Sequence, residues 1–170
     1  SPEVVFEHGR ILSVDDIEQG YVAIDPNGTS VRVRKSTSVM FPRRGPDYTE
    51  TVKGKKNDDG ETDEENIILL PGHFEGLWGL TIDRRLFKRR YVIDLGSSAL
   101  PSMVEIDVFT GVHGGLVVVE AEMNSAEELR ALRADPPDWF GFDVTDKREF
   151  GNVWLAQHGM PEGWWELANT

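Results

Sequence analysis

Hydrophobic and polar residues alternate along much of this chain, with the period of two that places successive strand side chains on opposite faces. The clearest case is VEIDVFTGVHGGLVVVEAEM, residues 104–123, whose halves flank a glycine-rich turn and so predict a hairpin. Alternation places four carboxylates on one surface of this hairpin: Glu105, Asp107, Glu120 and Glu122. Like charges at such distances repel, so this surface needs a cation, a proton or full solvation.

The same period predicts strands elsewhere along the chain, namely at residues 17–24, 30–35, 48–54, 64–70 and 86–95, with a further short one at residues 4–6. We expect Asp15 and Asp16 to form a turn, and the charged stretch of residues 55–65 to form a loop.

Helices are expected in three places: residues 71–80, residues 125–133 behind the capping pattern Ser125-x-x-Glu128, and a last helix opened by Asp146-x-x-Glu149. The total is seven or eight strands and about three short helices. Most connections are too short for parallel crossovers, so the fold class is α+β with a largely antiparallel sheet.

Charged residues occupy alternate positions in these strands, with apolar residues on the other face. The cationic positions are Arg32, Arg34, Lys53, Lys88 and Arg90, and the anionic ones add Glu64 to the hairpin carboxylates. Two interpretations remain open. One is an antiparallel sheet with a solvated face whose mixed charges pair across strands. The other is a closed barrel with a polar lumen, covered outside by helices.

Clustered cations and carboxylates together favour one ligand chemistry, a polyanion accompanied by hard metal ions. Arginine forks and lysine ammonium groups bind phosphate oxygens. Carboxylates hold Mg²⁺ or Mn²⁺, which in turn bridges to phosphates. The charge pattern therefore points to a site for a phosphate compound.

The composition of the chain limits the classes of protein and the kinds of site that it can form. With 170 residues, 39% hydrophobic and 28% charged, the chain is expected to form one domain, residues 1–170. A net charge of −12 argues against non-specific nucleic-acid binding, and no apolar run reaches membrane-spanning length. The absence of cysteine excludes thiolate metal sites and is typical of a cytoplasmic protein. No P-loop, GxSxG elbow or HExxH motif is present.

Seven sequence fragments, taken together, resemble the CYTH family, the triphosphate tunnel metalloenzymes. They are IEQGY, VRVRK, TVKG, RRLFKRRY, EIDVF, LVVVEAEM and WFGFDVTDKREFGN, and they follow the family's order from residue 17 to about residue 158. The resemblance implies an eight-stranded antiparallel tunnel that binds triphosphates and uses Mg²⁺ or Mn²⁺. It further implies hydrolysis of the terminal phosphoanhydride, with inorganic tripolyphosphate preferred and nucleoside or thiamine triphosphates as further substrates.

By matching position, the resemblance also implies roles for individual residues. The substrate-binding set is Arg32, Arg34, Lys53, Lys88, Arg90, Arg148 and Tyr21. The metal-binding set is Glu64, Asp107, Glu120 and Glu122. The catalytic set is Lys88, Arg90 and Glu122. Partners are then a small-molecule triphosphate, with no nucleic acid and no membrane, and a homodimer is left open.

Two departures from the family pattern bear on catalysis. Residues 3–9 do not reproduce its ExExK strand, and Asn66 stands where the family has a second glutamate in the strand of Glu64. Three alternative functions therefore remain open: a module that binds a triphosphate or polyphosphate without turning it over, an adenylyl cyclase of the same family, or a structural sheet protein that binds no phosphate.

Overall fold

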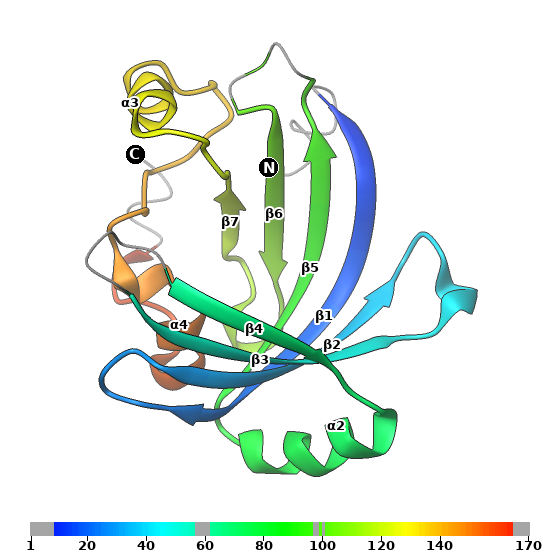
Figure 1. The fold of residues 1–170 in the computed structure, drawn as a ribbon. Helices are drawn as coiled ribbons and strands as arrows, with labels where there is room; N and C mark the ends of the chain where they lie inside the picture. Colours follow the sequence, from blue (N-terminus) through cyan, green and yellow to red (C-terminus); the bar gives the residue numbers. More distant parts are fainter. Residues whose placement is uncertain (1–8, 57–61, 97–98, 100, 165–170) are drawn as a thin grey trace.

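The computed structural model describes residues 9–56, 62–96, 99 and 101–164, and its main element is one antiparallel sheet (Figure 1). The strands lie in the order β4-β3-β2-β1-β5-β6-β7. Their bounds are β1 Arg10–Ile24, β2 Ser30–Ser38, β3 Asp47–Lys56, β4 Thr62–Ile68, β5 Arg85–Asp94, β6 Met103–Phe109 and β7 Val117–Glu120. Every neighbouring pair is antiparallel, as the short connections predicted.

The central strand β1 joins two arms of the sheet, a β2–β4 arm on one side and a β5–β7 arm on the other (Figure 1). It is 15 residues long, and the predicted turn at Asp15 and Asp16 is wrong. Asp15 pairs with Ser38 of β2 and with Arg90 of β5, so strands on both sides keep this polar pair extended.

The predicted closed, eight-stranded barrel is wrong for the described residues, which form seven strands in an open sheet. Closure requires hydrogen bonds between the two outermost strands. Here β4 pairs with β3 and β7 pairs with β6, and β7 offers only four residues for any further pairing. The strand expected at residues 4–6 lies outside the described residues.

The helices follow the predictions at two of three places. Helix α2 spans Pro71–Trp78 and is followed by the 3-10 turn η2, Gly79–Thr81. Helix α3, Ala126–Ala134, begins after Ser125, whose hydroxyl oxygen accepts a hydrogen bond from the backbone N–H of Glu128.

The last helix, α4, begins at Asn152 and ends at His158, later than predicted. The reason lies in the residues that were expected to open it. The carboxylate of Asp146 binds Arg133 of α3 instead of capping backbone N–H groups. A separate 3-10 turn, η4 (Arg148–Phe150), comes next, and Gly151 is extended.

Each face of the sheet is covered by a different helix. On one, which we call the α2 face, Phe74 and Trp78 of α2 contact Tyr48 of β3 and Phe87 of β5. The other, the α4 face, carries a core in which Leu155 and Ala156 of α4 meet strand residues: Tyr21, Leu86 and Phe109, with Leu116 beside them. Trp164 also packs against this core, near the glycine-rich turn.

A second core covers the far end of the β5–β7 arm. There Ile93, Val104 and Ile106 are buried under Trp139 and Phe140. None of the described helices has the length and apolar composition to span a membrane.

Candidate functional site

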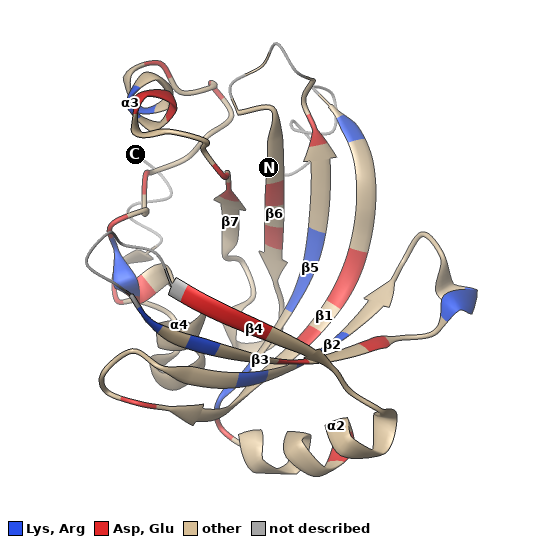
Figure 2. Ribbon diagram, viewed as in Figure 1, with Lys and Arg blue, Asp and Glu red and all other residues tan. Residues whose placement is uncertain are grey.

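Most of the predicted site residues lie on the α4 face, as strand alternation requires. Figure 2 shows basic residues on β2, β3 and β5, and acidic residues on β4 and β6. Cross-strand pairing brings Arg32 opposite both Tyr21 and Thr51, and Arg90 opposite Asp107. The sheet therefore collects charges from segments far apart in the sequence onto one surface.

On the β5–β7 arm, Arg90 is the centre of a cluster of carboxylates. Its guanidinium binds both oxygens of Asp107 at 2.7 Å, Glu120 at 2.9 Å, and Glu105. Burial lowers the pKa of Arg90, but the hydrogen bonds and charges of Asp107 and its neighbours outweigh this and raise it. Three of the four hairpin carboxylates thus hold a cation supplied by the chain itself.

Lys88 lies beneath this cluster and is fully buried. Its ammonium group donates to Asp107 at 2.5 Å and to Asn152, the first residue of α4, at 3.3 Å. Burial lowers the pKa of Lys88, and the negative charge of Asp107 opposes this. Burial alone would raise the pKa of Asp107, but its bonds to Arg90 and Lys88 hold that pKa below the usual value. Asp107 is therefore a carboxylate that remains ionised between two cations.

On the β2–β4 arm, one carboxylate of the described residues faces several cations on the α4 face. Glu64 of β4 lies 3.3 Å from Arg32 of β2 and 3.7 Å from Lys53 of β3. Asn66, on the same face of β4, accepts a hydrogen bond from the Thr51 hydroxyl at 2.7 Å. Because an amide stands at residue 66, no second carboxylate is present there to neutralise Arg32 or Lys53.

Arg34 is the cation of this arm with the fewest partners. No carboxylate of the described residues lies within salt-bridge distance of it, and its Nε is buried without a hydrogen-bond partner. The same holds for the Nε of Arg32. Burial, together with the positive charges of Arg32 and Arg90, lowers the pKa of Arg34 to about 10, so it is a cation at neutral pH.

A buried amide, Gln19, connects Arg34 to Tyr21. Arg34 donates to the Gln19 carbonyl at 3.1 Å, and the Gln19 amide donates to the Tyr21 hydroxyl at 3.0 Å. Burial raises the pKa of Tyr21, which keeps the phenol protonated at neutral pH. The sequence prediction included Tyr21 and Arg34 but missed Gln19 and Asn152. Alternation would have found Gln19, because it lies two residues before Tyr21 on the same face.

Two predicted site residues lie apart from these clusters. Arg148 is exposed in η4 and stacks on Trp154, with 4.8 Å between the guanidinium carbon and the ring centre. Glu122 is exposed and lies beyond the end of β7, so it does not share a strand face with Glu120 as the alternation predicted.

The described carboxylates do not fit a metal site as they lie. Asp107, Glu105 and Glu120 hold Arg90, while Glu64 lies on the other arm with Arg32 and Lys53. Within the described part of the chain, no three histidine, aspartate or glutamate side chains come together in a metal-binding group. The oxygen donors suit Mg²⁺ or Mn²⁺ in kind, but in this arrangement the charges are balanced by arginine and lysine.

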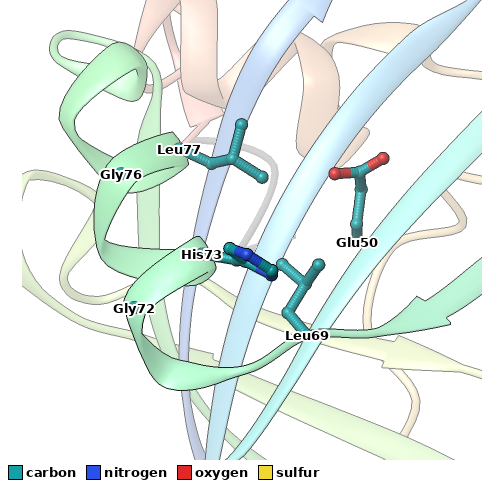
Figure 3. Close-up of a pocket in the computed structure, with 6 residues that line it drawn as sticks. All are labelled: Glu50, Leu69, Gly72, His73, Gly76 and Leu77. Carbon is teal, nitrogen blue, oxygen red and sulfur yellow. The ribbon is translucent and has the colours of Figure 1, made fainter.

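A shallow pocket of about 440 Å³ lies elsewhere, between α2 and β3 on the α2 face (Figure 3). In Figure 3, His73 and Leu77 extend from α2, and Glu50 comes from β3. It is mostly apolar and contains none of the predicted site residues. The charged surface of the α4 face is therefore the better candidate for phosphate chemistry.

Comparison with known proteins gives one strong relative. The chain is 31% identical over 153 residues to the inorganic triphosphatase of Nitrosomonas europaea, and the match covers 89% of each chain. No family model matches. Among solved structures, the inorganic triphosphatase NE1496 is similar at 30% identity, with a TM-score of 0.63 over 90% of this chain and 91% of that one. The PH1819 protein from Pyrococcus horikoshii is similar in fold, at 16% identity and a TM-score of 0.51 over 78% of this chain and 77% of that one.

Proposed function

We propose that this chain, which belongs to the CYTH family of the Nitrosomonas europaea inorganic triphosphatase, hydrolyses the terminal phosphoanhydride of a triphosphate. Inorganic tripolyphosphate is the proposed substrate, because the relative is an inorganic triphosphatase at 31% identity over most of both chains. Nucleoside and thiamine triphosphates are secondary candidates that the same charges would accept.

The observation that carries this proposal is Arg34. Its guanidinium is partly buried, has no carboxylate partner among the described residues, and has a buried Nε without an acceptor, which costs free energy unless an anion binds. Arg32, beside it, has the same unpaired Nε. Phosphate oxygens suit both groups, because the guanidinium fork presents parallel N–H donors that match their geometry.

The remaining residues then have separate roles in the reaction. Arg32, Arg34 and Lys53 bind phosphate oxygens, and the protonated Tyr21 hydroxyl donates a further hydrogen bond. The resemblance further assigns Lys88 and Arg90 to the charge that develops on the leaving diphosphate as water attacks the terminal phosphorus, a role that requires both cations to give up part of their pairing with Asp107. Arg148 is exposed in η4 and binds the outer end of the substrate in this scheme.

The requirement for Mg²⁺ or Mn²⁺ stays a prediction from the family resemblance, with Glu64, Asp107, Glu120 and Glu122 as its residues. In the present arrangement, the carboxylates of Asp107 and Glu120 bind Arg90, and that of Glu64 binds Arg32 and Lys53. A cytoplasmic location, favoured by the absence of cysteine, also stays a prediction.

Phosphate release from tripolyphosphate tests the proposal, with ATP and thiamine triphosphate as comparison substrates and either Mg²⁺ or Mn²⁺ present. Release of orthophosphate from tripolyphosphate is expected. Tight calorimetric binding of tripolyphosphate without release would instead select the non-catalytic binding module. Formation of cyclic AMP from ATP would select the cyclase.

A further inference from the structure

We propose that Gln19 is a positioning residue that fixes Arg34 and Tyr21 relative to each other on the α4 face. The inference rests on the proposed function in that it concerns the same anion site. Gln19 is 0% exposed, and both of its side-chain hydrogen bonds go to residues of that site.

The chemistry of the three side chains sets the direction of the hydrogen bonds. A guanidinium can only donate, so the group of Gln19 that faces Arg34 must be its carbonyl oxygen. The amide nitrogen then faces Tyr21 and donates to the phenol oxygen. The phenol oxygen therefore accepts from Gln19, which leaves its own proton for a different acceptor.

Within the described part of the chain, no acceptor takes that proton. The arrangement Arg34 to Gln19 to Tyr21 thus leaves two donors without an acceptor among the described residues: the Nε–H of Arg34 and the O–H of Tyr21. A phosphate oxygen is an acceptor that suits both. Gln19 accordingly determines both the position of the donors and the direction of the phenol proton.

The backbone around Gln19 leaves it little freedom to move. It pairs directly with Arg34 across β1 and β2, and with the apolar Leu86 on its other side. The next residue, Gly20, lies so close to Thr81 that an added Cβ would stand 2.5 Å from its hydroxyl oxygen. Since Leu86 offers no polar group, the amide has its two site partners and no alternative from that strand.

A double-mutant cycle tests this role against a merely structural one. The substitutions are Gln19→Met, which keeps the length of the side chain and removes both hydrogen bonds, and Arg34→Met. The readouts are the calorimetric Kd for tripolyphosphate and the separate values of kcat and KM for its hydrolysis. We expect Gln19→Met alone to raise Kd and KM about tenfold, with a smaller change in kcat. In the Arg34→Met background we expect Gln19→Met to change Kd less than about twofold, because the guanidinium that it positions is gone.

Thr81→Val is the matched control. Thr81 is also 0% exposed and hydrogen-bonded, to the Trp78 carbonyl and Arg85, and these bonds lie on the α2 face. Valine keeps the shape that packs against Gly20 and removes only the hydrogen bonds, so the backbone beside Gln19 stays supported. It is expected to lower Tm without changing Kd. An unchanged Kd in Gln19→Met, or an equal effect of that substitution in both backgrounds, would overturn the inference. If the wild-type protein binds tripolyphosphate but releases no phosphate, the proposed hydrolysis is wrong. The role of Gln19 is still tested in that case, because the double-mutant cycle is measured by Kd.

Discussion

The two arms of the sheet carry similar numbers of charges on the α4 face but neutralise them to different degrees. On the β5–β7 arm, Lys88 and Arg90 meet three carboxylates, and every cation has at least one partner. On the β2–β4 arm, Arg32 and Lys53 share the carboxylate of Glu64, and Arg34 has no acidic partner among the described residues. The β5–β7 arm is therefore a closed salt-bridge cluster, whereas the β2–β4 arm retains positive charge that an anion can neutralise.

Folding explains why the two arms can differ. Lys88 and Asp107 are almost fully buried, and burial of an ion pair is tolerated only when the pairing is nearly complete. Arg32 and Lys53 keep partial exposure, so water offsets part of the missing carboxylate. Arg34 is also partly buried but has no carboxylate partner among the described residues, and the cost is offset in part by its hydrogen bond to Gln19.

Removing the negative charge of Glu122 is expected to have the largest effect on activity. The family resemblance assigns Glu122 to a metal ion, and among the described residues no cation pairs with it. Glu122→Gln should therefore reduce phosphate release to background, as should removal of Mg²⁺ and Mn²⁺ with EDTA. Glu127→Gln on the exposed face of α3 is the control, and retained activity in Glu122→Gln would contradict the metal assignment.

The comparison of the arms is tested next by Arg34→Met. Loss of one pre-positioned donor to developing charge typically costs about 100-fold or more in rate, and we expect a loss of that order in kcat/KM for tripolyphosphate. Lys35→Met is the matched control, because Lys35 is the next residue of β2 but forms its salt bridge with Glu18 on the opposite face, at 2.6 Å. Equal losses in the two variants would indicate a general effect of charge rather than a site at Arg34.

On the other arm, Asp107→Asn should act mainly on stability. The substitution leaves buried Lys88 without its carboxylate, and breaking a buried pair costs about 3–5 kcal/mol. Urea unfolding measures the change. Asp16→Asn, which breaks the half-exposed pair with Arg89, should cost no more than about 1 kcal/mol. If the two substitutions cost the same, the salt-bridge cluster is not a special source of stability.

Lowering the pH is expected to change the free energy of unfolding by a smaller amount. Because the pKa of Asp107 is lowered in the folded state, its contribution to stability is fully present above the unfolded pKa of about 3.9. That contribution is lost as the pH falls through the lower, folded pKa. The difference in unfolding free energy between the wild type and Asp107→Asn should therefore shrink from pH 6 to pH 2.5. If the difference stayed constant over that pH range, ionisation of the Asp107 carboxylate would not be the source of this stability.

Alternation in the sequence predicted most of the sheet and the face of each charged strand residue. It succeeded because the face of a strand side chain depends only on whether its position is odd or even. Lys88 and Arg90 therefore share one face of β5, and Phe87 lies on the other. The antiparallel order followed from short connections. The resemblance added roles for individual residues, and those roles stay predictions.

What the sequence could not provide depends on contacts between distant segments. Strand pairing on both sides kept Asp15 and Asp16 extended, although the pair has turn-forming composition. Asp146 bound Arg133 of another helix and so did not open α4. Whether the sheet closes depends on its outermost strands, and the partners of Arg90 and Arg34 depend on which carboxylates lie within reach. These are the features that distinguish the two arms.

Binding of the anion at the Arg34 guanidinium, whose Nε has no partner among the described residues, can be observed by side-chain NMR. The Nε–H resonances of the arginines can be followed while tripolyphosphate is added without divalent cations. We expect the resonances of Arg34 and Arg32, whose Nε atoms are buried and unpaired, to shift strongly. The resonance of Arg89, which binds Asp16 on the opposite face, should not shift. Unchanged Arg34 and Arg32 resonances at saturating tripolyphosphate would contradict binding of the anion at Arg34.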